Sequence, residues 1–367
     1  MKIINGLVFN EKHQMEQKSL SFENGVITED SHGEVFDAKD CYVLPGFIDT
    51  HVHGAGGVEF YASDYSGDYK PALDYLSSVG VTSILVTLAT ETVDEYIADS
   101  NRLLNSNDDR ILGIHCEGPF VNPVRKGGLH PDKIQKPNPD ILDILQKHSG
   151  NKLKIITLAP ELDNSHEVIK EAIKKGIKVS MGHTDATYQE AKKAVDLGAS
   201  RSTHTFNAMR PLNHRESGII GVALTDDRVN CELICDLHHV SKPAIDLVIR
   251  SKGIDNVTMI SDCSFFCGIP EGKYLLNGRY LYVENGFAKL ENGTICGSAC
   301  SLAVGAKNMF DIGYKPEEIA VMACVNPAKA AGCNNRGELK VGCRADVIVL
   351  DKAFNVIAVF VNGKRVK

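Results

Sequence analysis

The stretch LPGFIDTHVHGAGG, Leu44–Gly57, carries two histidines, His51 and His53, one residue apart at the end of an apolar run, and glycines follow at once. Alternate side chains of a strand point to one face, so the two imidazoles project together and can bind one ion. An H-x-H pair alone is equally consistent with one histidine in the core and the other at a turn. Donors from elsewhere in the chain must decide between these interpretations.

Composition limits the classes of protein to consider. The chain has 367 residues, of which 43% are hydrophobic and 24% charged, which fits one large barrel-type domain plus a smaller module or two ordinary domains. A formal charge of −7 argues against nucleic acid or an anionic membrane as the main partner. The N-terminus lacks the apolar region of a signal peptide, and no window reaches the length of a membrane span. Eleven cysteines, none in a C-x-x-C pair, favour a reducing compartment, so we expect a cytoplasmic protein.

Eight apolar, β-rich runs alternate with segments of helical periodicity. The runs cover residues 42–53, 81–90, 110–118, 153–161, 178–184, 201–209, 229–239 and 257–263. Helical patterns lie at 70–80, 93–105, 139–150, 165–176, 187–198, 242–253, 301–313 and 316–332, several of them closed by glycine. Such strands, each followed by a crossover, predict parallel pairing buried on both faces and a (β/α)₈ TIM-like barrel. An open doubly wound sheet is the alternative, but HVHGAGG is not its phosphate-binding loop.

The two ends of the chain have a different pattern. Short alternating runs and Asn-Gly turns predict β structure at 1–44 and 341–367. We expect both termini to form one small β-sandwich module beside a barrel at 45–340.

Titratable residues fall where the predicted barrel strands end, which is the face that carries the chemistry in such barrels. They are His51, His53, Glu117, His183, His204 and Asp262. Any one of them has an ordinary structural explanation, but six at one rim are hard to explain by chance. Imidazoles and carboxylates together suit Zn, Fe, Mn or Co, so we expect a divalent metal site.

Several motifs together resemble the amidohydrolase superfamily and, within it, the N-acetylglucosamine-6-phosphate deacetylase family. They are PGFIDTHVHG, HCEGPFVNPVRKGGLHP, MGHTDATYQEA, THTFNAMRPLNHRESGI, GSACSLAV, NPAKAAG and GCRADVIVLD. The resemblance implies hydrolysis of the acetamide of N-acetylglucosamine 6-phosphate. It also implies that Glu117, His183 and His204 hold the principal metal, while His51 and His53 can complete a second site. One or two ions remain open.

Two related reactions fit the sequence less well. A cyclic-amide hydrolase would require a lysine at the end of the fourth predicted strand, whereas Lys152 and Lys154 lie at its start. A purine deaminase would require a glutamate just after His183, where this chain has Thr184 and Asp185.

The rim position of Asp262, opposite the candidate ligands, suggests that it would accept a proton from water and deliver it to the sugar nitrogen. The resemblance implies that His239 would contact the substrate near the developing oxyanion. Strand alternation instead places His238 on the same face as Asp236. Arg215 would bind the phosphate from a loop that reaches across a homodimer interface, and the other substrate-binding candidates are Gly128, Asn207, Ala208, Ile295, Cys296 and Gly297.

One departure from the family pattern leaves the substrate open. Small residues usually follow the aspartate at the eighth strand, whereas Asp262 is followed closely by Phe265 and Phe266. The alternatives are a deacetylase of N-acetylgalactosamine 6-phosphate or of another N-acyl amino sugar, and a non-catalytic scaffold. A scaffold would have lost ligands, and this chain keeps all of them.

Overall fold

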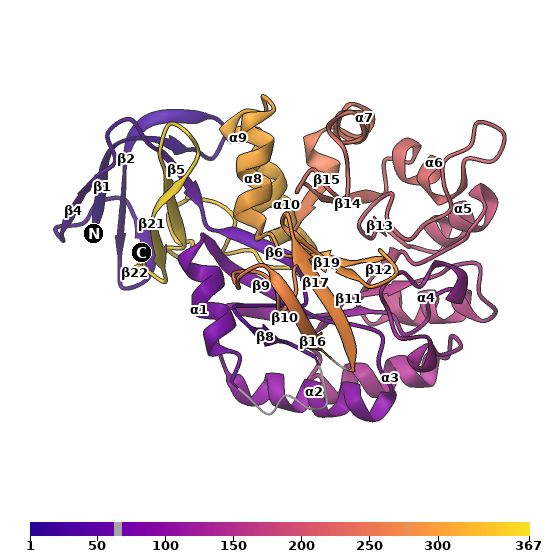
Figure 1. The fold of residues 1–367 in the computed structure, drawn as a ribbon. Helices are drawn as coiled ribbons and strands as arrows, with labels where there is room; N and C mark the ends of the chain where they lie inside the picture. Colours follow the sequence, from indigo (N-terminus) through magenta and orange to yellow (C-terminus); the bar gives the residue numbers. More distant parts are fainter. Residues whose placement is uncertain (62–67, 277) are drawn as a thin grey trace.

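The largest part of the molecule is a nearly closed barrel of eight parallel strands (Figure 1). The computed structural model describes residues 1–61, 68–276 and 278–367. In their order around the barrel the strands are Phe47–Val52 (β6), Val81–Leu88 (β9), Ile111–Glu117 (β10), Leu153–Leu158 (β11), Lys178–Met181 (β12), Arg201–Ser202 (β13), Asn230–Ile234 (β14) and Val257–Ile260 (β15). Each lies within one of the predicted runs, and the predicted barrel is confirmed.

The barrel closes between β15 and β6. The hydrogen bonds that close it lie just beyond the end of β15. The Asp262 N–H donates to the His51 carbonyl at 2.9 Å, and the His53 N–H donates to the Cys263 carbonyl at 2.7 Å. This seam brings the first and the last candidate site residues of the barrel together.

Helices follow most of the strands and surround the barrel (Figure 1). They are Lys70–Ser78 (α1), Val93–Ser106 (α2), Pro139–His148 (α3), Ser165–Lys174 (α4), Tyr188–Asp196 (α5), Gly218–Thr225 (α6), Lys242–Lys252 (α7) and Leu302–Asp311 (α8). Short 3₁₀ turns lie at Pro123–Arg125 (η1), Pro131–Lys133 (η2) and Ile254–Asn256 (η3). The sequence analysis did not predict α6, which is apolar on all sides and buried and therefore lacks an amphipathic pattern.

The last helical segment packs across the seam of the barrel. It runs through Pro316–Ala320 (α9), the π-helical Val321–Val325 (η4) and Asn326–Ala331 (α10), and it contacts β6 and β15. Pro327 has no N–H for the Ala323 carbonyl, and the helix widens just before it.

Both termini contribute to a second sheet at one end of the molecule, where Figure 1 marks N and C. Its strands are Lys2–Phe9 (β1), Met15–Glu23 (β2), Val26–Thr28 (β3), Val35–Asp37 (β4), Tyr42–Pro45 (β5), Val347–Leu350 (β20), Val356–Val361 (β21) and Lys364–Arg365 (β22). The sheet has a hydrophobic core of its own, which includes Phe22, Val43 and Phe360. A small β module made from both termini, as predicted, is therefore present.

An antiparallel sheet that the sequence analysis did not predict separates β15 from α8. Its strands are Gly272–Leu276 (β16), Arg279–Glu284 (β17), Phe287–Leu290 (β18) and Ile295–Ser298 (β19). Phe266, Leu281 and Val283 form part of a separate apolar cluster beneath it. Two further short strands, Gly54–Ala55 (β7) and Val58–Glu59 (β8), follow β6.

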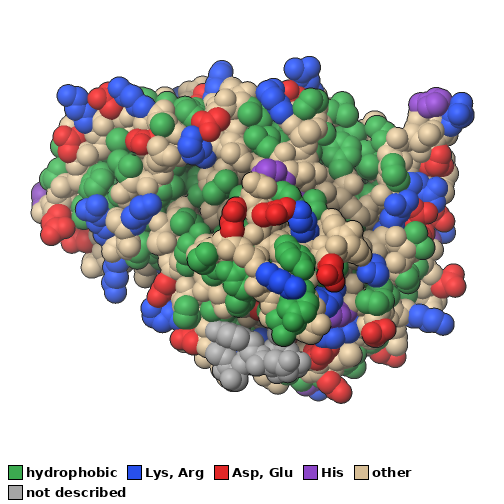
Figure 2. Space-filling model, viewed as in Figure 1, with side chains coloured by type: hydrophobic (Ala, Val, Ile, Leu, Met, Phe, Trp, Pro, Cys, Tyr) green, Lys and Arg blue, Asp and Glu red, His purple; other side chains and the backbone are tan. Residues whose placement is uncertain are grey.

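The surface carries charges of both signs. On the face shown in Figure 2, lysine and arginine side chains are interspersed with acidic ones, without a continuous area of one sign. In the described part of the chain, none of the helices combines the length and apolar character needed to cross a bilayer.

Candidate metal centre

A cavity of about 540 Å³ lies at the carboxyl ends of the barrel strands. The predicted site residues that line it are His53, Glu117, Gly128, His183, His204, Asn207, Ala208, His239, Asp262, Ile295, Cys296 and Gly297. His51 lies just behind this wall and is fully buried. Arg215 does not line the cavity.

The first ligand group consists of Glu117, His183 and His204, which end or follow β10, β12 and β13. Glu117 Oε1 lies 3.0 Å from both His183 Nε2 and His204 Nε2, and the two nitrogens are 3.1 Å apart. All three side chains are buried. The candidate ligand atoms therefore converge on one point.

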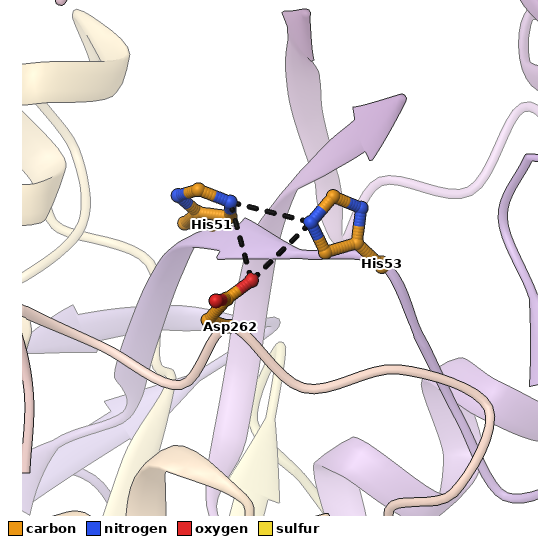
Figure 3. Close-up of side chains that lie close together, drawn as sticks. All are labelled: His51, His53 and Asp262. Carbon is orange, nitrogen blue, oxygen red and sulfur yellow. Dashed lines mark hydrogen bonds and ion pairs between the residues drawn. The ribbon is translucent and has the colours of Figure 1, made fainter. Parts of the chain in front are cut away.

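The second ligand group consists of His51, His53 and Asp262, which point toward one another across the seam (Figure 3). The two Nε2 atoms are 3.3 Å apart. Asp262 Oδ1 lies 3.4 Å from His51 Nε2 and 3.3 Å from His53 Nε2. The residue predicted to act as a base thus lies beside both histidines of the second group.

Glu117 joins the two groups. Its Oε1 is 3.3 Å from His51 Nε2, and its Oε2 is 3.3 Å from His53 Nε2. Burial alone would raise the pKa of Glu117, but the charges of His51 and His183 hold it well below its ordinary value. Burial alone would lower the pKa of His53, but hydrogen bonds to Asp262 and Glu117 raise it to about 9.

Unusual backbone conformations aim three of these side chains. His183, His204 and Asp262 have φ angles of 47°, 29° and 51°, in the left-handed region that non-glycine residues rarely adopt. Such residues cost about 1–3 kcal/mol each and cluster at functional sites. The strained backbone marks the rim where β12, β13 and β15 end.

Outer contacts hold the imidazoles of His51 and His183 from behind. His51 Nδ1 donates to Glu232 Oε2 at 3.2 Å, which leaves Nε2 to face the centre. Glu232 also accepts from Arg201 at 3.1 Å and from the His204 N–H at 3.3 Å. His183 Nδ1 donates to the Arg125 carbonyl at 2.9 Å. These outer contacts fix His51 and His183 in the tautomer that a metal requires.

His115 lies one layer deeper, with its ring 4.6 Å from that of His51. Its Nε2 is 2.8 Å from the Thr157 hydroxyl. Burial, followed by the charge of His51, lowers the pKa of His115 to about 3. His115 is therefore a neutral core histidine beneath the site.

His239, rather than His238, faces the cavity. The chain leaves β14 at Ile234, and Leu237 has a φ of 66°, so strand alternation no longer applies. Asp236 accepts from the backbone N–H groups of His238 and His239, and its Oδ2 accepts from His239 Nδ1 at 2.6 Å. The His239 ring is thereby oriented with its other nitrogen free to contact a ligand.

Arg215 occupies a different place from the other predicted substrate contacts. It is exposed, in the loop between β13 and α6 that extends beside α6 in Figure 1. Phe265 and Phe266 are the two aromatic residues that depart from the family pattern after Asp262. Phe266 lines the cavity, whereas Phe265 does not. Both pack on Tyr274 of β16, at 5.8 Å for Phe266 and 6.3 Å for Phe265 between ring centroids.

Sequence reasoning missed several residues of the cavity wall. They include Glu59, Tyr61, Lys133 and Arg279. The signal for Arg279 was the alternating pattern RYLYVENG, which predicts a strand and a turn. The signal for Glu232 behind the wall was a lone acid inside the apolar run CELIC.

The donor set fits divalent transition-metal ions. Four imidazole nitrogens and two carboxylates converge in a buried cluster, and imidazole with carboxylate is a ligand set typical of Zn, Fe, Mn or Co.

Known proteins resemble this chain along most of its length. Residues 42–366 match the Amidohydrolase family. The chain is 33% identical over 362 residues to an N-acetylglucosamine-6-phosphate deacetylase of Lysinibacillus sphaericus, and this alignment covers 95% of this chain and 93% of that protein. It is 32% identical over 338 residues to an N-acetylgalactosamine-6-phosphate deacetylase of Escherichia coli O157:H7, with 89% of this chain and 88% of that protein covered.

A solved structure extends this similarity to the fold. A variant of the N-acetyl-D-glucosamine-6-phosphate deacetylase of Mycobacterium smegmatis, in complex with N-acetyl-D-glucosamine-6-phosphate, superposes with a TM-score of 0.92 at 27% identity. The match covers 100% of this chain and 99% of that chain.

Proposed function

The chain belongs to the amidohydrolase family, and we propose that it hydrolyses the acetamide of N-acetylglucosamine 6-phosphate to glucosamine 6-phosphate and acetate. The observation that carries this proposal is the contact of Glu117 with all four imidazoles, with Asp262 beside them at the rim. The related deacetylases match this chain over most of its length and over most of their own. This similarity supports the choice of substrate.

Two groups of residues would hold metal. Glu117, His183 and His204 would bind the principal ion, and His51 with His53 would bind a second, with Glu117 able to contact both. When bound, a divalent cation supplies Lewis acidity, which polarises an amide carbonyl and acidifies water. Zn, Fe, Mn and Co all suit these ligands.

Asp262 would act as the general base and then as the general acid. Burial would raise its pKa, but the charge of the neighbouring His51 lowers it, so the carboxylate is ionised at neutral pH. It would accept a proton from the attacking water and deliver it to the departing sugar nitrogen. Its position at the seam, 3.3 Å from His53 Nε2, supports this role.

His239 would stabilise the developing oxyanion. Burial lowers its pKa, but the hydrogen bond to Asp236 outweighs burial and raises it, which favours a cationic imidazole beside the cavity. A charged donor aimed at the carbonyl oxygen strengthens its contact as negative charge develops.

The remaining predicted residues would bind the sugar phosphate. Gly128 and the 295–297 segment would contact the sugar, and Asn207 with Ala208 would offer donors to the phosphate. Arg215 of the partner subunit would reach this cavity in a homodimer, which its exposure on a loop supports. We infer a cytoplasmic location from the eleven unpaired thiols.

An acetate-release assay tests the proposed function. Metal-reconstituted protein is supplied with N-acetylglucosamine and N-acetylgalactosamine, each with and without the 6-phosphate. We expect the highest kcat/KM for N-acetylglucosamine 6-phosphate. Absence of acetate release from every sugar, in protein shown by elemental analysis to hold metal, would contradict the proposal.

The galacto epimer is the second candidate substrate. It is favoured by the related galactosamine enzyme and by Phe266, whose ring at the cavity wall replaces the small residue typical of the family. A higher kcat/KM for N-acetylgalactosamine 6-phosphate in the same assay would select it.

A further inference from the structure

Arg279 opens β17 at the tip of the hairpin that covers the cavity. It pairs with Leu276 across the hairpin, and both residues line the cavity. Along β17, Leu281 and Val283 on the same face are buried, whereas the intervening Tyr280 is 51% exposed. Strand alternation therefore turns the Arg279 side chain toward the cavity.

The guanidinium of Arg279 has unused donors. Its Nη1 donates to the Gly128 carbonyl at 3.0 Å. Its Nε is buried and has no hydrogen-bond partner among the described residues, and none of their carboxylates forms an ion pair with it. A guanidinium offers five donors, and the contact with Gly128 uses one of them. Lys133, the other long cation of the wall, is already paired with Glu95 at 2.7 Å.

Charge is distributed unevenly around the cavity. Glu117 and Asp262 contact the histidines of the metal centre, whereas Arg279 contacts the loop of Gly128. Burial lowers the pKa of His130, and the nearby charges of Arg279 and then Lys133 lower it further, so these cations share one side of the wall. Arg279 therefore offers an anionic group of a substrate a positive partner on the side of the wall formed by the Gly128 loop.

We propose that Arg279 binds the 6-phosphate of the substrate from within the same chain and thereby orients the acetamide toward the metal centre. The proposal rests on the proposed function. A guanidinium can grip a phosphate with two parallel hydrogen bonds. Arg279 is the only arginine among the described residues that line the cavity, and Arg215 of the same chain lies outside it.

The test compares a phosphorylated and an unphosphorylated sugar on metal-loaded enzyme. R279Q should raise KM for N-acetylglucosamine 6-phosphate by about tenfold to a hundredfold, the effect of losing one charged hydrogen bond. Its kcat/KM for N-acetylglucosamine should stay within about twofold, because that sugar has no phosphate to lose. R279K keeps the charge but lacks the paired donors of a guanidinium, so its KM for the phosphorylated sugar should lie between those of wild type and R279Q. The control R250Q, on the exposed face of α7, should have the KM of wild type.

Two outcomes would overturn the proposal. Equal losses for both sugars would show that Arg279 only supports the Gly128 loop, and an unchanged KM for the phosphorylated sugar would show that it makes no phosphate contact. Calorimetric titration with glucosamine 6-phosphate, which keeps the phosphate but has no acetamide to hydrolyse, separates this inference from turnover. Wild type that binds the sugar phosphate more tightly than R279Q supports the contact even if no acetate is released, and equal affinities contradict it.

Discussion

The two ligand groups use similar atoms but are anchored differently. In the first group, His183 donates through Nδ1 to a backbone carbonyl, that of Arg125. In the second, His51 donates to the carboxylate of Glu232, which is fully buried and paired with Arg201. A main-chain anchor is insensitive to substitution, whereas a side-chain anchor can be removed by one change. The difference predicts that the second ion can be lost without the first.

The carboxylate anchor also affects the ligand itself. A charged acceptor behind an imidazole fixes its tautomer and increases its basicity, which strengthens metal binding. Burial raises the pKa of Glu232, but the hydrogen bond from His51 and the charge of Arg201 outweigh it and depress that pKa, so the anchor is an ion. The second group therefore depends on a charge outside the cavity.

Substitution of Glu117, which touches both groups, should have the largest effect. E117Q removes the charge that balances four imidazoles, so we expect metal content below one ion per chain and activity at background. Elemental analysis of purified protein and the acetate assay measure both quantities. E59Q is the matched control, since Glu59 is another buried acid of the cavity wall, whose Oε2 accepts from the Phe265 N–H. Full metal content in E117Q would remove the basis for treating the groups as one centre.

Substitution of Asp262 should separate chemistry from binding. D262N keeps the size of the side chain but cannot accept a proton, so we expect kcat to fall by about 10²–10⁴-fold. Metal at Glu117, His183 and His204 should remain, as measured by elemental analysis. Activity within about tenfold of wild type would exclude Asp262 as the general base.

Substitution of Glu232 tests the difference between the groups directly. E232Q should weaken binding of the second ion by about tenfold to a hundredfold, the usual effect of losing an outer-sphere carboxylate. Affinity for the first ion should change little, because Glu232 contacts that group through the backbone N–H of His204 and not through an imidazole ring. Titration of metal-free protein with Co²⁺, followed by absorbance, resolves the two steps. Equal weakening of both would mean that Glu232 anchors the whole centre.

The sequence predicts the inner part of this centre better than its surroundings. The candidate ligands could be found because parallel strands that end at one rim bring distant residues such as Glu117 and His204 together. Arg279 was missed because its strand belongs to a sheet inserted after the last barrel strand, although Asn285–Gly286 and Asn292–Gly293 are turn signals. Strand alternation did not predict that His239 faces the cavity. Asp236 accepts hydrogen bonds within a turn at Leu237, and hydrophobic periodicity does not reveal such a turn.

A further buried acid shows how a carboxylate behaves at this end of the barrel without a histidine beside it, and its substitution should have the smallest effect. Glu91, which follows β9, is buried, and burial followed by the charge of Asp99 raises its pKa to about 10. The folded chain then holds a proton that the unfolded chain releases above pH 4.5 or so, so stability should fall as pH rises from 5 to 9. The slope is at most about 1.4 kcal/mol per pH unit for one proton. In E91Q this contribution is absent, so the unfolding midpoints of the two proteins should differ little at pH 5, with the variant more stable at pH 9. Parallel pH profiles for the two proteins would show that Glu91 is ionised in the folded state and that burial at this end of the barrel does not by itself hold a proton.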